Sequence, residues 1–315
     1  MQTTASQAPR KMKIQRGDIG ADHSVQALTP YKVIGVIVLI ILALLFLFPL
    51  YWIITGSFKS PQVINAATPQ WFPLEPVISN YERLFQKPAF TWIWNTVYMC
   101  VMSMLLTCVA ASMGGYALAK KRFAGNKIIF TLFILAMALP KQVILIPLLK
   151  EMAWLRLHNT LWAVILPTVG WPFGVFLMMQ FSENIPNELL EASRIDGAGE
   201  ARTFLEIVLP LISPGIGALA IFTFISAWND YLLQLIMLND TQVLTISLGI
   251  AKLQSELSTD FGLIMAGAAL GSIPIIVIFL MFQKFFTRGK LLFIIFIHFD
   301  FGIICFFNCF FVFIK

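Results

Sequence analysis

Residues 185–214, IPNELLEASRIDGAGEARTFLEIVLPLISP, interrupt an otherwise apolar sequence and decide how its helices are arranged. Pro186 suits the first turn of a helix, and strong helix formers follow it. Gly197 predicts the end of that helix, because glycine readily adopts the left-handed conformation. A second helix is expected at about residues 199–208, ending before Pro210. The stretch therefore predicts two short helices joined by a hinge, in a loop of about 25 residues, a length that is usually functional.

The sequence on either side of this loop is too apolar for a soluble protein. Of 315 residues, 58% are hydrophobic and 12% are charged, and the mean hydropathy is +0.82. Because a soluble domain carries about 25% charged residues, this composition excludes a soluble globular protein and a disordered one. The four cysteines lie in apolar runs and lack C-x-x-C or zinc-type spacing, so we interpret them as membrane-core residues.

Long gaps between charged residues predict the membrane spans. A helix needs about 20 apolar residues to cross about 30 Å of hydrocarbon. The sequence has six such gaps, the third interrupted by Pro140 and Lys141, and so predicts an all-α polytopic membrane bundle of six transmembrane helices. The predicted spans are residues 33–58, 88–119, 128–149, 157–182, 207–229 and 261–283.

Basic residues predict the orientation of these spans, because short cytoplasmic loops carry the excess of Lys and Arg. The tail at residues 1–30, the loops after the second and fourth spans, and the segment after the sixth carry thirteen basic residues: Arg10, Lys11, Lys13, Arg16, Lys120, Lys121, Arg122, Lys127, Arg194, Arg202, Lys284, Arg288 and Lys290. The opposite loops carry six: Lys59, Arg83, Lys87, Lys150, Arg156 and Lys252. We therefore expect a cytoplasmic N-terminal tail and a cytoplasmic loop at residues 183–210.

Small residues in two spans predict close helix contacts. Gly114 and Gly115 belong to overlapping small-xxx-small pairs in the second span, and Gly267 and Gly271 form a G-x-x-x-G pair in the sixth. Lipid tails do not drive helices together by hydrophobicity, so close backbone approach contributes much of their association. These glycines support a packed bundle and do not indicate a substrate.

The loop resembles the EAA loop of binding-protein-dependent ABC importer permeases. The resemblance lies in Glu191-Ala192-Ser193, Asp196-Gly197-Ala198 and Ile207-x-Leu209-Pro210, with Ser193 in place of the third small residue of the motif. Other motifs follow in the order seen in the carbohydrate, MalG-like group: Asn80-Tyr81, Asn95-Thr96, Pro140-x-Gln142-Val143-x-x-Ile146-Pro147, Trp228-Asn229-Asp230, Ile273-Pro274 and Phe282-Gln283. The resemblance covers residues 31–290, with the core transmembrane module at about residues 90–285.

This resemblance implies a permease subunit of an ATP-driven importer in the inner (cytoplasmic) membrane of a bacterium or archaeon. Its cargo would be a sugar or oligosaccharide delivered by an extracytoplasmic binding protein. The implied partners are a second homologous permease and two ATPase subunits. The implied ATPase-coupling residues are Glu191, Ala192, Ser193, Asp196, Gly197, Ala198, Ile207 and Pro210. Leu189, Leu190 and Phe204 are expected to be apolar anchors for the partner, and small neighbours would allow close approach.

The chain itself is expected to have no catalytic residues, no metal, no cofactor and no nucleic-acid partner. A phosphate-binding loop needs G-x-x-x-x-G-K, because its backbone N–H groups surround the phosphates. The single Gly-Lys pair, Gly289-Lys290, has Lys284 where the first glycine should be. ATP is therefore expected to bind to the partner ATPase.

Two ionisable residues are candidates for a place inside the membrane: Lys141, within the third predicted span, and Asp230, if the fifth span runs a turn or two past residue 229. A charge at the bilayer centre costs at least about 2.5–3.5 kcal/mol, so such residues are functional candidates. The candidates for the substrate path are Lys141, Gln142, Trp228, Asn229 and Asp230. Alternatively, Lys141 snorkels at a helix break, and Asp230 belongs to an anchor at the outer membrane interface.

Two other functions stay open: an ion-coupled secondary transporter with Asp230 or Lys141 as its proton site, and an ABC permease for a solute other than a sugar. Residues 291–315 depart from the family pattern and include nine phenylalanines. This atypical apolar tail is either a seventh span or a frame-shifted end without a selected role.

Overall fold

The computed structural model describes residues 30–256 and 260–287. The expectations for the N-terminal tail and for the apolar tail at residues 291–315 fall outside this part of the chain. The chain divides into two units, Met1–Pro49 and Leu50–Lys315. In the first unit, helix α1 (Pro30–Ser57) begins, and its large apolar side chains between Val33 and Phe48 are exposed. Exposure of this kind suits a helix that faces lipid.

The structure supports the predicted membrane bundle. Among the described residues, four helical segments are long and apolar enough to cross a membrane, and there are up to six if each of two bent helix pairs forms one span. The four are Val33–Ser57, Ala89–Lys120, Trp162–Glu183 and Phe261–Met281. The all-α fold class is confirmed, and the number of spans depends on how the two bent pairs are counted.

The third predicted span is a sharply bent pair of helices. Helices α5 (Asn126–Ala138) and α6 (Lys141–Trp154) meet at 108°, so the interruption expected at Pro140 and Lys141 is present as a sharp bend. Leu139 and Pro140 are both extended, with ψ of 129° and 132°. The proline ring disfavours helical backbone in the residue before it, and proline has no N–H to donate to the preceding turn. The chain therefore changes direction at the predicted break.

The fifth predicted span also begins with a bent segment. Helix α10 (Glu200–Thr203) continues through the π-helical turn η1 (Phe204–Val208) into α11 (Leu209–Leu211), and α12 (Ser213–Asn229) follows at 75°. The expected helix end before Pro210 is wrong. Pro210 is tolerated in the first turn of α11, directly after the π turn, where the hydrogen-bond register changes.

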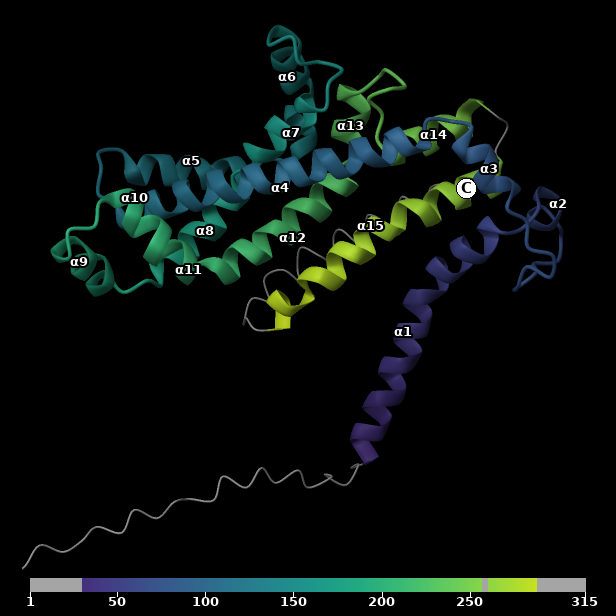
Figure 1. Ribbon diagram of the computed structural model, residues 1–315, viewed down its shortest axis with the longest axis horizontal. Coiled ribbons are helices and arrows are strands. Elements are labelled where there is room, and N and C mark those ends of the chain that lie inside the picture. Colours follow the sequence, from purple (N-terminus) through teal and green to yellow (C-terminus); the bar gives the residue numbers. More distant parts are fainter. Residues whose placement is uncertain (1–29, 257–259, 288–315) are drawn as a thin grey trace, which may run out of the picture. The chain divides into compact units, whose positions relative to one another are not determined.

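Within the second unit, helix α4 (Ala89–Lys120) packs against α7 (Trp162–Val169), α8 (Phe173–Glu183) and α12 (Figure 1). A Cβ on Gly115 of α4 would lie 2.6 Å from the backbone nitrogen of Met179 in α8. The absence of a side chain at Gly115 therefore allows the two backbones to approach closely, as the small-residue pattern predicts.

Asn95 and Thr96 of α4 bind the segment that precedes α14 (Ile246–Glu256). The Asn95 side-chain amide donates to the backbone oxygens of Gln242 (2.8 Å) and Leu244 (3.0 Å), and the Thr96 hydroxyl accepts from the backbone N–H of Ile246 (2.9 Å). Both side chains are buried. The Asn-Thr motif therefore holds together two parts of the chain that are distant in sequence.

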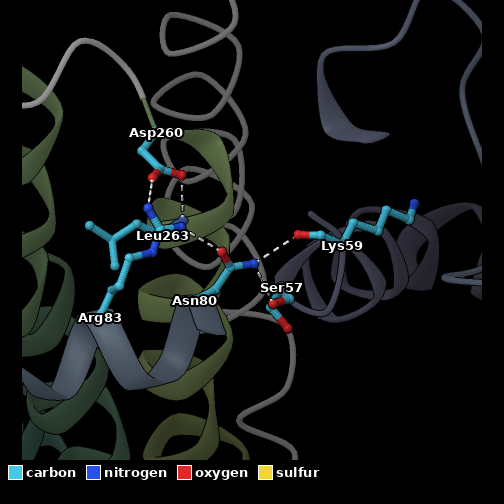
Figure 2. Close-up of polar contacts among 6 residues, drawn as sticks. All are labelled: Ser57, Lys59, Asn80, Arg83, Asp260 and Leu263. Carbon is cyan, nitrogen blue, oxygen red and sulfur yellow. Dashed lines mark hydrogen bonds and ion pairs between the residues drawn. The ribbon is translucent and has the colours of Figure 1, made fainter. Parts of the chain in front are cut away.

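A second polar network joins the end of α1, α3 (Ser79–Phe85) and the start of α15 (Phe261–Thr287), as Figure 2 shows. The fully buried Asn80 donates to the backbone oxygens of Ser57 and Lys59, both at 2.9 Å, and accepts from Arg83 at 2.8 Å. Arg83 also forms an ion pair with Asp260, which accepts the backbone N–H of Leu263 at the start of α15. These bonds satisfy polar groups that would be costly to bury alone.

Candidate functional site

The predicted hinge between two loop helices is present in the structure. Helix α9 (Asn187–Ile195) ends at Asp196, and Gly197 has φ of +77°. The backbone N–H of Ala198 donates to the Ser193 carbonyl at 2.9 Å, which closes the helix end. The next helix starts at Glu200, so a left-handed glycine separates the two helices, as a C-terminal helix cap requires.

Ser193, the residue that departs from the EAA pattern, links the two arms of the loop, which are α9 and the helical segment that starts with α10. Its buried hydroxyl donates to the Leu190 carbonyl at 2.8 Å and lies 3.1 Å from the Thr203 hydroxyl in α10. The serine therefore adds a polar contact between the helices that alanine could not make.

The exposed surface of the loop differs in part from the expected one. The side chains of Glu191, Ala192, Asp196 and Pro210 are exposed together with Gly197, whereas Ala198 and Ile207 are half-buried and Ser193 is buried. Leu189 is exposed, as expected of an apolar anchor.

The other two expected anchors, Leu190 and Phe204, pack inside the chain instead. Leu190 is buried in the bundle core, and the half-buried Phe204 packs against Tyr116, with ring centroids 5.6 Å apart. Ile195 and Leu205 are instead exposed, at 86% and 59%. The sequence could have predicted the exposure of Ile195, because this apolar residue lies between two charged residues, Arg194 and Asp196, at the end of the helix.

The two predicted intramembrane charges lie at helix breaks and face each other. Lys141 is the first residue of α6, and Asp230 lies between α12 and α13 (Tyr231–Met237). The Lys141 ammonium is 3.6 Å from the Asp230 carboxylate and 4.9 Å from the centroid of the Trp171 ring. The Lys141 side chain is 46% exposed and the Asp230 side chain is 21% exposed. Each charge therefore has a counter-charge within the same chain.

The charged pair lines a cavity of about 100 Å³ between α4, α6, α7, α8, α12 and α13. The other polar residues of its lining are Thr107, Gln142, Thr168, Thr223 and Ser226, and Trp171 is an aromatic part of it. The buried Thr107 hydroxyl has no hydrogen-bond partner among the described residues. The cavity thus presents one neutralised ion pair, one amide and several hydroxyl groups.

Trp228 and Asn229 do not line this cavity. The Trp228 ring is 5% exposed and stacks on Phe224 with centroids 5.8 Å apart, and the exposed Asn229 amide donates to the Ile225 carbonyl at 3.0 Å. Trp171, which follows the helix break at Gly170, is the aromatic residue that the sequence did not single out. Its sequence signal was a Trp-Pro pair inside a predicted span.

Comparisons with known proteins identify the class of this protein. A family model described as "Binding-protein-dependent transport system inner membrane component" matches residues 107–291. The chain belongs to this family. It is therefore a multi-pass membrane permease subunit of a binding-protein-dependent ABC transport system, and this membership decides against the ion-coupled secondary transporter.

Individual relatives cover most of the chain. It is 32% identical over 273 residues to the "Arabinooligosaccharides transport system permease protein AraQ" of Bacillus subtilis, covering 85% of this chain and 96% of the relative. It is 27% identical to the "Trehalose/maltose transport system permease protein MalG" of Thermococcus litoralis, covering 82% and 94%. A solved "bacterial ABC transporter involved in the import of the acidic polysaccharide alginate" shares the fold, with a TM-score of 0.73 and 22% identity over 81% of this chain and 96% of that chain.

Proposed function

We propose that this chain translocates a sugar or oligosaccharide as one permease subunit of an ATP-driven importer. The observation that carries the proposal is the 32% identity to a relative named for arabinooligosaccharide transport, over 85% of this chain. The cavity chemistry agrees, because threonine and serine hydroxyls, an amide and an aromatic ring suit a polyhydroxylated, uncharged solute. An ABC permease for another solute is the alternative.

The proposed assembly contains this chain, a second homologous permease, two ATPase subunits that bind ATP, and an extracytoplasmic sugar-binding protein. One structural relative was solved as an alginate transporter "in complex with alginate pentasaccharide-bound periplasmic protein". Closure of the ATPase pair would move the loop at residues 183–210, with Glu191, Ala192, Asp196 and Gly197 at the docking surface. The bundle would then change between inward-facing and outward-facing states.

The proposal is tested by uptake of labelled arabino-oligosaccharides into proteoliposomes that contain the whole complex. We expect uptake that requires ATP and the binding protein and that continues when an ionophore dissipates ion gradients. Uptake of amino acids or peptides, with no sugar uptake in the same vesicles, would reject the sugar assignment.

We propose that the cavity beside Lys141 and Asp230 is part of the translocation path. At about 100 Å³ it is smaller than the roughly 300–1,000 Å³ of ligand pockets. We therefore propose that the second permease forms the rest of the path, or that a conformational change enlarges the cavity. Gln142 and Thr107, whose hydroxyl has no hydrogen-bond partner in the described part of the chain, would bind sugar hydroxyls there, and Trp171 would provide an apolar face.

Asp230→Asn is expected to reduce sugar uptake severalfold, because it leaves the Lys141 cation without its counter-charge at the cavity. The double variant Lys141→Gln/Asp230→Asn removes both charges and should recover much of the lost uptake. Lys150→Gln is the matched control, since it removes an exposed lysine of the same helix that does not line the cavity. Equal uptake in all three variants and the wild type would contradict a role in the path.

We also propose that the membrane is the inner membrane, with a cytoplasmic N-terminus and loop. Arg194→Cys in a cysteine-free chain should resist a membrane-impermeant thiol reagent in intact cells. Gly125 is expected on the same side, but its φ of +90° makes cysteine strained there, so the probe is placed at the exposed Ala124. Gln86→Cys, in a predicted outer loop, should label. Labelling at Arg194 from outside would overturn both the topology and the coupling role.

A further inference from the structure

Two consecutive lysines at the end of α4 attach the bundle to the loop. Lys120 is the last residue of the helix, and its ammonium donates to the backbone oxygens of Glu183 (3.2 Å) and Ile185 (2.6 Å) and to the side-chain oxygen of Asn187 (3.1 Å). These acceptors lie at the end of α8, in the connection between α8 and α9, and at the first residue of α9. A cation is favourable there, because carbonyl groups at a helix C-terminus carry partial negative charge. Lys120 therefore binds the end of α4 to the start of the loop.

Lys121 contacts the other arm of the loop, the one that starts with α10. Its ammonium forms a hydrogen-bonded ion pair with the Glu200 carboxylate at the first residue of α10, and it lies 5.3 Å from the centroid of the Tyr116 ring. The hydrogen bond from Lys121 lowers the pKa of Glu200 below its usual range, so the carboxylate is charged at neutral pH. Arg194 of α9 also lies 3.4 Å from Glu200. Glu200 thus joins α4 and both loop helices.

The contact lies at one end of an apolar groove between α4 and the second arm. The groove has a volume of about 1060 Å³. It is lined on one side by α4 residues that include Tyr116, with Lys121 directly after the helix, and on the other by residues of α10 to α12 that include Glu200 and Leu205. The Tyr116 and Phe204 rings contact each other across the groove, with centroids 5.6 Å apart. The Lys121–Glu200 pair adds a charged contact between the same two sides.

We propose that Lys120 and Lys121 are positioning residues that transmit movement of the loop to α4. The inference rests on the proposed coupling function of the loop. A force on α9 or α10 would reach the end of α4 through short polar contacts, and α4 would pass it to α7, α8 and α12, against which it packs. With 29% of the Lys121 and 62% of the Glu200 side chain exposed, the ion pair contributes little to stability. Its loss should therefore change coupling more than folding.

The test measures sugar uptake per ATP hydrolysed in the reconstituted complex, normalised to assembled complex. Lys121→Gln and Glu200→Gln should each lower this ratio about fivefold or more, the lower end of typical coupling between sites. The double variant should be no worse than either single variant, because both remove the same contact. Lys121→Arg keeps the charge and should retain most of the ratio, and Lys120→Met should lower it.

Arg202→Gln is the matched control, because its 2.9 Å pair with Glu206 lies within one arm of the loop. It should leave the ratio unchanged. If the Lys121 and Glu200 variants keep the wild-type ratio while Gly197→Asp lowers it, the loop couples and the transmitting role of the lysines is overturned. If all of these variants keep the ratio, the proposed coupling function of the loop itself fails. A loss of assembly with a normal ratio per assembled complex would also reject the lysine role.

Discussion

Gly197→Asp is expected to lower sugar uptake per ATP hydrolysed about tenfold without removing the permease from the membrane. Gly197 has φ of +77°, and a non-glycine residue in the left-handed region is strained by about 1–2 kcal/mol. A second carboxylate would also repel Asp196 at the proposed docking surface. Apart from its chain neighbours, no atom of the described residues lies within 4 Å of a Cβ at this position, so the effect is on the hinge angle rather than on packing.

Gly199→Asp is the matched control for this variant. Gly199 lies in the same loop and also has open space around a Cβ, but its φ is −69° and it caps the start of α10. Aspartate is a favourable residue at that cap position, so uptake per ATP should stay near the wild-type value. Sugar uptake and sugar-stimulated ATP hydrolysis are measured in assembled complexes with the permease quantified. A wild-type ratio in Gly197→Asp would reject the hinge as a coupling element.

Gly115→Ala is expected to have the largest effect on stability. Its Cβ would lie 2.6 Å from the Met179 nitrogen and 2.7 Å from the Met178 carbonyl carbon, both backbone atoms. Backbone cannot rotate away as a side chain can, so α4 and α8 would have to separate. Overpacking of a core typically costs about 1–3 kcal/mol, and loss of the contact between these two packed spans adds to that cost.

Gly114→Ala tests whether the effect belongs to this contact. A Cβ on Gly114 would lie 3.6 Å from the Val175 methyl groups, an ordinary van der Waals distance. The two variants make the same chemical change in adjacent residues of one helix. Thermal unfolding of the detergent-solubilised protein is followed by the loss of its folded peak in size-exclusion chromatography. We expect the unfolding temperature of Gly115→Ala to be several degrees below that of the wild type, and that of Gly114→Ala to match the wild type. Equal unfolding temperatures for both would contradict the close approach of α4 and α8.

Local features of the fold could be predicted because their causes act over a few residues. Pro140 restricts Leu139 directly, so the break in the third span followed from adjacent residues. The hinge at Gly197 likewise depends on the conformational freedom of one residue. The bend angle after Pro140 and the passage of the helix through Pro210 did not follow, because they depend on how neighbouring segments pack and on the π turn before Pro210.

Assignments that depend on which helix faces meet were less reliable. Leu190 and Leu189 are adjacent and chemically identical, yet only Leu190 is buried. Trp228 was the tryptophan expected at the path or the membrane interface, yet Trp228 is enclosed in the core and Trp171, which was not singled out, lines the cavity beside Lys141. Nearly uniform apolar helices have no polar face that would reveal their orientation.

The sequence by itself therefore determined the membrane class, the break at Pro140 and the loop with its glycine hinge, because span length and backbone restrictions are encoded locally. Only the tertiary structure decided that Lys141 faces Asp230, that Ser193 contacts Thr203, and that Lys121 pairs with Glu200. These partners are distant in sequence or lie on separate helices. Their contacts exist because packing places α6 beside α13 and α9 beside α10, and the order of residues along each helix does not specify which helices pack together.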